Sequence, residues 1–406
     1  MTLEVARVSF EDVLNNIYKV LDNPDFQRGV DTSASNFEKK IPMVLQKWPE
    51  LVEVAKEVKR IKEEVIKNPR KYIDQVMESL KNINAKPYLA ETAEEAREIV
   101  AKIIGDRKLI VMSKSMVAEE IGLREYLEEH GKEVWETDLG QFLVQVENGR
   151  PMHPIVPAIH MRREYAAKLL RERLGFPLKG DEPIEDIVKR VRMFLRDKIK
   201  NAEVGISGAN AVAADTGAIF LVENESNIRL VTGFPPVHIA VTGVDKIVPT
   251  FLDAMKVIMA QSAYIALYPP TYVDVIAGPS STGDIELHRV FGAQGPLELH
   301  VVFVDNGRLK AAEHPVLKDQ LRCIRCGRCC IECPVWRHTA NIWGGPTYGG
   351  PMGINWTAIT LGEEAGAELA HLCLGCGRCR ESCPMEIPLD EMIRYLKTVY
   401  NKKHGI

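Results

Sequence analysis

The chain has 406 residues, of which 46% are hydrophobic and 27% charged, with a formal net charge of −4. This length predicts two or three domains, each large enough to bury a hydrophobic core. The small net negative charge gives no electrostatic basis for binding nucleic acid or an anionic membrane surface, so we expect neither.

No targeting or membrane-spanning segment is expected. Residues 1–20 are charged and lack the apolar core of a secretory signal. The most apolar helix candidate, 250–268, is interrupted by Asp253, Lys256 and Gln261, which predicts a buried helix rather than a span. All nine cysteines lie from Cys323 to Cys383, so the first 322 residues hold no disulfide framework of the secreted kind. We expect a cytoplasmic protein that reaches a membrane only through partners.

Residues 1–85 are predicted to form amphipathic helices. Between residues 45 and 80, apolar side chains recur every three to four positions amid lysine and glutamate. Pro69 is expected to separate two of these helices. We interpret this first region as a helical cap or docking arm.

Residues 86–308 alternate short apolar runs with amphipathic segments, which predicts an α/β domain built on an open sheet. The expected strands are 109–112, 134–137, 155–157, 204–206, 218–222, 229–231, 238–241 and 299–304. The expected helices are 116–130, 139–146, 162–174, 181–200 and 250–268. A helical lead-in over 310–322 then opens a third domain, 309–406.

Eight cysteines in the third domain form two matching runs with the spacing C-x2-C-x2-C-x3-C-P. This is the spacing of bacterial two-cluster ferredoxins, in which the fourth cysteine of each run binds the cluster of the other run. The predicted ligands of the first [4Fe–4S] cluster are Cys323, Cys326, Cys329 and Cys383. Those of the second are Cys373, Cys376, Cys379 and Cys333. Structural zinc is the competing interpretation, but zinc rarely needs the third cysteine and the proline of each run.

For other residues of this domain, the sequence is compatible with more than one role. The ninth cysteine, Cys330, is predicted to be a small buried apolar side chain rather than a ligand. Three tryptophans between the runs are expected to pack around the clusters or to form a docking face: Trp336, Trp343 and Trp356. Four arginines are expected to raise the reduction potentials, to be solvated, or to face an acidic carrier: Arg325, Arg328, Arg378 and Arg380.

Ordered sequence strings from about residue 94 to residue 389 resemble one family. They include Ser113-Lys114-Ser115-Met116, Gly205-Ile206-Ser207-Gly208-Ala209-Asn210, Glu223-Asn224-Glu225-Ser226-Asn227 and Asp305-Asn306-Gly307-Arg308. The chain resembles the iron–sulfur subunit of the bacterial and archaeal lactate-utilisation system, a lactate-utilisation (LUD) domain fused to a two-cluster ferredoxin. The resemblance implies a sheet domain related to sugar-phosphate isomerases and CoA transferases, followed by an α-helical ferredoxin domain.

The resemblance also implies a function and partners. It implies an electron-transfer subunit of a complex that oxidises lactate or another 2-hydroxy acid, with a cysteine-rich subunit and a flavin-bearing or second LUD-like subunit. The chain departs from the family pattern at Pro151-Met152-His153 and in its complete second cysteine run. The alternative function is therefore the iron–sulfur subunit of a heterodisulfide-reductase-like or flavin-based complex, with the central domain as a scaffold.

Candidate site residues of the central domain follow from the rule that ligands of open α/β sheets bind beyond the carboxyl ends of strands. The candidate cofactor-binding residues are Lys114, Gly208, Asn210 and Thr216. The candidate catalytic residues are Glu223 or His238 as a base and Arg229 as a carboxylate binder. Structural roles compete with each assignment, such as a surface charge for Lys114 or a positive φ for the glycines.

Oxidation of a 2-hydroxy acid releases two electrons, whereas one cluster accepts one. A flavin is the usual group that splits such a pair. The sequence contains neither a G-x-G-x-x-G fingerprint after a strand nor a P-loop. We therefore expect a flavin bound by another route on this chain, or carried by a partner.

Overall fold

The computed structural model describes residues 10–405, so the first nine residues of the predicted helical region lie outside the described part. The following segment forms four helices: α1 (Phe10–Leu21), α2 (Pro24–Lys47), α3 (Glu50–Lys67) and α4 (Pro69–Asn82). Asn23 caps α2, because its side-chain oxygen accepts hydrogen bonds from the first amides of the helix. Pro69 stands at the first position of α4, which confirms the predicted break.

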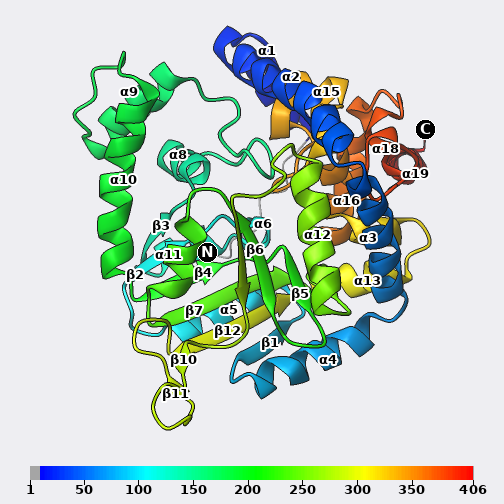
Figure 1. Ribbon diagram of the computed structural model, residues 1–406. Helices are drawn as coiled ribbons and strands as arrows, with labels where there is room; N and C mark the ends of the chain where they lie inside the picture. Colours follow the sequence, from blue (N-terminus) through cyan, green and yellow to red (C-terminus); the bar gives the residue numbers. More distant parts are fainter. Residues whose placement is uncertain (1–9, 406) are drawn as a thin grey trace.

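The central element is a six-stranded sheet in which every neighbouring pair is parallel (Figure 1). Its strands, in spatial order, are β1 (Lys86–Ala90), β12 (Glu298–Val304), β7 (Val237–Gly243), β4 (Val204–Ser207), β2 (Leu109–Met112) and β3 (Glu133–Glu136). Alternate side chains of β12 pack on opposite faces. Val302 belongs to one hydrophobic core and Phe303 to the other. Both faces are therefore covered, as expected of a parallel sheet.

Helices occupy both sides of this sheet. The helices of this region are α5 (Ala93–Ile104), α6 (Met116–Glu120), α7 (Leu123–Glu129), α8 (Leu139–Glu147), α9 (Arg163–Leu174), α10 (Ile184–Asn201) and α11 (Asn227–Gly233), of which α9 packs on α8. A second sheet contains β8 (Ile247–Val248), β5 (Ala211–Ala213), β6 (Ile219–Glu223) and β9 (Tyr272–Ile276). The helix α12 (Phe251–Ala263) packs between this second sheet and α3 (Figure 1). A small hairpin contains β10 (Ser281–Thr282) and β11 (Val290–Phe291).

The C-terminal region is helical and lies beside α1, α2 and α3 (Figure 1). Its α-helices are α13 (Arg308–Glu313), α14 (Arg328–Ile331), α15 (Pro334–Thr339), α16 (Gly350–Thr360), α17 (Glu363–Leu369), α18 (Arg378–Glu381) and α19 (Leu389–His404). The 3-10 turns of the chain are η1 (Val244–Lys246), η2 (Leu317–Arg322), η3 (Ala340–Ile342) and η4 (Ala370–Leu372). The architecture is therefore the predicted one: an α/β unit with a parallel sheet, N-terminal helices and a helical C-terminal region.

Two predicted strands are wrong. Residues 229–231 lie in α11, because the Glu223 carboxylate accepts a hydrogen bond of 2.6 Å from the amide of Ile228 and so caps a helix there. Residues 155–157 form a loop. The amides of Ile155 and Val156 donate to Nδ1 of His153, 3.2 Å away, instead of pairing with a strand.

Three predicted helices are shorter or divided. The helix over 116–130 is interrupted at Gly122, whose φ of +60° is left-handed. The helix over 250–268 ends at Ala263, shortly before a second left-handed residue, Ala266. The lead-in over 310–322 is divided into α13 and η2. Within residues 10–405, no helix is long and apolar enough to cross a membrane.

One close approach between α11 and β4 explains a glycine. A Cβ atom added to Gly205 would overlap the backbone carbonyl oxygen of Val231. Only a residue without a side chain lets the helix pack this closely on the strand.

We expect Gly205→Ala to lower the free energy of unfolding by about 1–3 kcal/mol, the usual effect of overpacking. Gly233→Ala is the matched control, since a Cβ atom there meets nothing within 4 Å. Chemical denaturation of both variants checks the prediction. Equal stability of the two variants would contradict the close approach.

Candidate functional site

The eight cysteines of the two runs divide between two cavities. Cys323, Cys326, Cys329 and Cys383 line the first cavity. Cys333, Cys373, Cys376 and Cys379 line the second. Each cavity thus receives three thiols from one run and the fourth from the other, which is the grouping expected for crossed ligation. Four thiols around an enclosed space are a donor set that suits a [4Fe–4S] cluster, and the ligation itself stays a prediction.

The two runs fold alike. Arg325 in the first run and Gly375 in the second have φ values of +61° and +67°. The backbone amide of Arg325 lies 3.4 Å from Cys323 Sγ, and that of Gly375 lies 3.4 Å from Cys373 Sγ. Amide hydrogen bonds to sulfur raise the reduction potential of an iron–sulfur cluster.

The two cavities differ in depth. The three cysteines that the first run contributes to the first cavity are buried, whereas Cys373 is half-buried and Cys376 is exposed in the second. Beside them, Leu374 has 71% of its surface exposed. Burial raises the pKa of the Cys333 and Cys383 thiols to about 12. Iron binding must therefore displace protons from these thiols.

The tryptophans and Cys330 are part of the core. The side chains of Trp336, Trp343 and Trp356 are completely buried, which confirms packing and excludes a docking face made by these rings. Cys330 is also completely buried, and its Sγ lies 3.5 Å from the carbonyl oxygen of Gly349. It lines neither cysteine cavity.

The four arginines of the runs have different surroundings. Arg325 is buried, whereas Arg378 is exposed. Arg328 lies 3.7 Å from Glu332, and Arg380 lies 3.5 Å from Asp390. Among these four arginines, only Arg325 lines a third cavity, which lies next to the α/β domain and is called the large cavity below.

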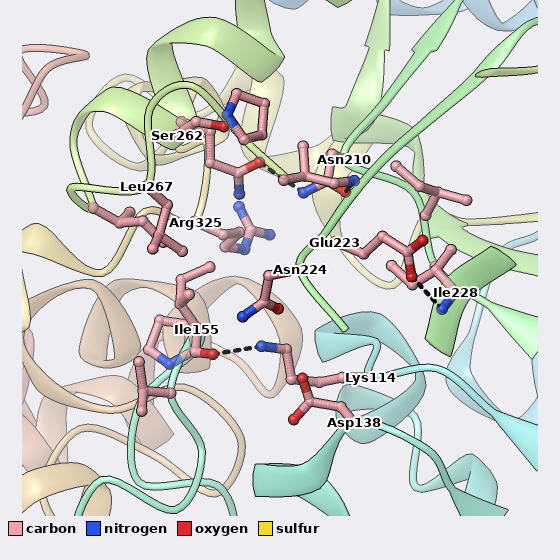
Figure 2. A pocket seen from close by; sticks show the side chains of 18 of the residues that line it. Lys114, Asp138, Ile155, Asn210, Glu223, Asn224, Ile228, Ser262, Leu267 and Arg325 are labelled. Carbon is pink, nitrogen blue, oxygen red and sulfur yellow. Dashed lines mark hydrogen bonds between the residues drawn. The ribbon is translucent and has the colours of Figure 1, made fainter. Parts of the chain in front are cut away.

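This third cavity has a volume of about 600 Å³ and lies between the α/β domain and the first cysteine run (Figure 2). Lys114, Asp138 and Gly208 follow the carboxyl ends of β2, β3 and β4 and line it. Lys246 follows β7, and Arg325 enters from the cysteine run. The cavity thus lies where ligands of open α/β sheets bind, and its volume is typical of a small-molecule site.

Only some of the predicted site residues of the α/β domain line this cavity. Lys114, Gly208, Asn210 and Glu223 line the cavity, and Figure 2 shows three of these side chains around it. Thr216 lies instead in the turn between β5 and β6, where its Oγ1 accepts a hydrogen bond from the amide of Ala218. Arg229 is outside the lining, 2.8 Å from Asp274 and 3.3 Å from Glu223.

His238 also lies outside the cavity lining, fully buried in β7. Its Nε2 is 2.8 Å from Ser207 Oγ, which itself donates to the carbonyl oxygen of Gly208. Burial lowers the pKa of His238 to about 3, so the ring is neutral.

Three ionisable groups that line the cavity have pKa values near neutrality. Burial, followed by the neighbouring Asp138 carboxylate, raises the pKa of Glu225 to about 7. Burial, followed by the neighbouring Asp274 carboxylate, raises the pKa of Glu223 to about 7. Burial, followed by the Arg325 guanidinium, lowers the pKa of Lys246 to about 7. Groups with such pKa values are suited to accept or donate protons at neutral pH.

A buried ion network fixes the cysteine run to the α/β domain. Arg308 contacts Asp245 at 2.6 Å and Glu120 at 2.7 Å, and Arg325 lies 3.3 Å from the same Asp245. The Arg325 guanidinium also lies 3.7 Å from the centre of the Trp356 ring. None of these partners was predicted from the sequence. The available signal was that Arg325 stands where the second run has Gly375.

One polar connection joins the cavity to the first cysteine run, and a second joins the loop beside the cavity to the same run. Asn210 donates to Gln261 Oε1 at 2.6 Å, and Gln261 donates to the carbonyl oxygen of Ile324 at 2.8 Å. On the other side, His153 Nε2 lies 3.3 Å from the carbonyl oxygen of Gly327. The departure noted at His153 is therefore a contact with the first cysteine run.

The buried neutral His238 predicts a pH dependence of stability. Its pKa is lower in the folded chain than in the unfolded chain, so stability falls as the pH drops from about 6.5 towards 3. Between pH 7 and pH 5 the loss is about 2 kcal/mol, at 1.36 kcal/mol per pKa unit. We expect His238→Gln to lose less stability over this interval, as measured by denaturant unfolding at both pH values. Identical pH dependence would contradict a neutral buried ring.

Two family models match this chain. The LUD domain model matches residues 73–304, and the 4Fe-4S dicluster domain model matches residues 319–387. Among solved structures, a DUF162 family protein from Deinococcus radiodurans is 15% identical with a TM-score of 0.33, covering 58% of this chain and 98% of its own.

Curated relatives match along nearly the whole chain. "Lactate utilization protein B" of Bacillus velezensis is 35% identical over 97% of this chain and 80% of its own length. The protein of the same name from Macrococcus caseolyticus is 33% identical over 100% and 83%. That from Bacillus licheniformis is 36% identical over 97% and 80%. The chain, a LUD domain followed by a 4Fe-4S dicluster domain, therefore belongs to the lactate utilization protein B family.

Proposed function

We propose that this protein is the iron–sulfur electron-transfer subunit of a complex that oxidises lactate or another 2-hydroxy acid. Family membership and the dicluster domain support a role in lactate utilization with iron–sulfur clusters. The observation that carries the proposal is the division of eight cysteines between two cavities of different depth. Two clusters together hold the two electrons that such an oxidation releases.

The residues of the chain would hold the clusters by crossed ligation. The first cluster would be bound by Cys323, Cys326, Cys329 and Cys383. The second would be bound by Cys333, Cys373, Cys376 and Cys379. Backbone amides donate to a sulfur of each set. The buried side chains of Met352, Ile387 and Leu389 line the first cavity, and that of Trp343 lines the second.

The difference in burial between the two cysteine cavities suggests where electrons are exchanged with a partner. The first cavity is next to the ion network and the large cavity of the α/β domain. Arg325 belongs to the network and lines the large cavity, and its backbone amide lies 3.4 Å from Cys323 Sγ in the first cavity. The second opens at the surface around Cys376, Leu374 and Arg378. A partner that exchanges electrons with this protein would therefore approach the second cysteine run.

The other subunits of the complex would supply the group that divides the electron pair. Each cluster accepts a single electron, so a flavin or an equivalent group must divide the electron pair. We place that group on a partner, either a flavin-bearing or second LUD-like subunit, with a cysteine-rich subunit as a further member. The family name supports the lactate assignment over a heterodisulfide-reductase-like complex.

The anaerobically purified protein should contain about eight iron and eight sulfide atoms, because each [4Fe–4S] cluster holds four of each. Cys333→Ala should damage the second cluster and spare the first, since the Cys333 thiol lies in the second cavity. Cys330→Ala is the matched control, a buried cysteine outside both cavities, and should keep full iron content. Iron analysis and EPR measure both effects. Loss of the first cluster in Cys333→Ala, or stoichiometric zinc in the parent protein, would contradict the ligand sets.

The iron-loaded, flavin-free protein alone should not be reduced by lactate, because no single-electron carrier can take the electron pair. Addition of the partner subunits should give lactate-dependent bleaching of the cluster absorbance. Replacing lactate by other 2-hydroxy acids in the same assay defines the substrate. Lactate-dependent reduction of the isolated protein would contradict the proposal that a partner carries the group that divides the electron pair. If no 2-hydroxy acid bleaches the cluster absorbance of the fully assembled complex, the result would favour the heterodisulfide-reductase-like alternative.

A further inference from the structure

The large cavity between the α/β domain and the first cysteine run has features of a ligand site. We propose that it binds an organic anion whose carboxylate or phosphate group contacts Arg325 and Lys246. The ligand would then lie directly against the loop of the first cluster. This inference rests on the proposed function only in treating the first cysteine run as a cluster loop.

The first observation is an unsatisfied guanidinium. Arg325 is only 4% exposed, yet its Nε has no hydrogen-bond partner among residues 10–405. Its Nη1 donates to the carbonyl oxygen of Cys323, and its Nη2 lies 3.3 Å from Asp245 in an ion pair. Figure 2 shows the guanidinium among the side chains that surround the cavity. A buried N–H without a partner is costly, and an anion in the cavity would remove that cost.

The second observation is an excess of buried positive charge. Lys62, Lys246, Arg308 and Arg325 are all buried. The buried carboxylates of the same network are Glu120 and Asp245, and both pair with the arginines, so neither lysine has a carboxylate partner in the network. Burial and the Arg325 guanidinium lower the pKa of Lys246 to about 7, and an anion in the cavity would stabilise its charged form. Lys62 is held on the far side by the carbonyl oxygen of Asp245, whereas Lys246 lines the cavity. A cluster bound in part by Cys323 would compensate some of this charge.

The third observation is the size and lining of the cavity. Its volume of about 600 Å³ is larger than a molecule of the size of lactate needs. Apolar side chains form much of its wall, including Phe37, Ile155, Leu267 and Tyr268. The polar groups opposite Arg325 include Lys114 and Asn224 (Figure 2). The ligand therefore has an organic body in addition to its acidic group.

Two contacts would couple this ligand to the first cluster. The backbone amide of Arg325 lies 3.4 Å from Cys323 Sγ, so the residue that binds the anion also contacts a cluster ligand. Gln261 lines the cavity and donates to the carbonyl oxygen of Ile324 in the same loop. Charge and hydrogen bonds near the sulfur atoms set the reduction potential and the EPR spectrum of a cluster.

The test is equilibrium dialysis of the anaerobic, iron-loaded protein against lactate, pyruvate, flavin mononucleotide and inorganic phosphate. Lys246→Met should weaken binding of the organic anion at least tenfold. Lys62→Met is the matched control, because it removes an equally buried charge from the same network outside the cavity lining. Its affinity should stay within threefold of the parent protein. Binding should also shift the EPR spectrum of the first cluster in the parent protein but not in Lys246→Met.

A second pair of variants tests the site at exposed residues, because a substitution of a buried lysine could also misfold the protein. Asn224→Trp places a bulky ring at an exposed residue of the cavity lining, whereas Asn201→Trp places it at an exposed residue of α10 outside the lining. Only Asn224→Trp should abolish binding while both keep their iron. Tight binding of lactate or pyruvate identifies a carboxylate substrate, and tight binding of flavin mononucleotide identifies a phosphorylated cofactor.

The proposal is overturned if no organic anion binds more tightly than millimolar, or if Lys246→Met and Asn224→Trp bind as the parent protein does. Binding of inorganic phosphate alone also overturns it, since the apolar wall requires an organic body. These outcomes are independent of lactate oxidation by the assembled complex. The electron-transfer function and the anion site can therefore fail separately.

Discussion

The arrangement of this protein depends on a buried ion network at the carboxyl end of the central sheet. Asp245, which follows β7, contacts Arg308 at 2.6 Å and Arg325 at 3.3 Å. Removing one partner of a buried ion pair typically costs about 3–5 kcal/mol, because a buried charge is left without compensation. The network thereby holds the first cysteine run against the α/β domain in one orientation. Arg325, which the network holds in place, also forms part of the wall of the large cavity.

This constraint gives the two cysteine runs different roles despite their matching sequence. The first run is enclosed by the ion network, the tryptophans and the N-terminal helices. The second run has no such cover over Cys376 and is open at the surface. Matching spacing therefore produces matching local folds, while tertiary contacts decide which run lies beside the large cavity and which lies at the surface. A gradient of burial of this kind suits a chain that carries electrons between an interior site and a docking partner.

The sequence predicted features that depend on local spacing and missed those that depend on distant contacts. Amphipathic periodicity and Pro69 located the N-terminal helices, and the cysteine spacing predicted which thiols meet. The strand predicted over 229–231 is a helix, because the Glu223 carboxylate accepts from the amide of Ile228, five residues later. This miss is of a local capping signal rather than of a distant contact. The strand-end rule placed Lys114 in the cavity but failed for Thr216, whose turn belongs to the second sheet. Asp245 and Lys246 also follow a strand end and were overlooked.

Arg325 shows why the cavity and the first cysteine run form one unit. A left-handed conformation costs a residue with a side chain roughly 1–2 kcal/mol, and the second run avoids this with Gly375. The first run keeps an arginine at φ +61° because its guanidinium reaches Asp245, the Trp356 ring and the cavity. Its backbone amide at the same time contacts Cys323 Sγ. A single residue thus connects the sheet, the cavity and a sulfur of the first run, so a change in any one of them is felt by the other two.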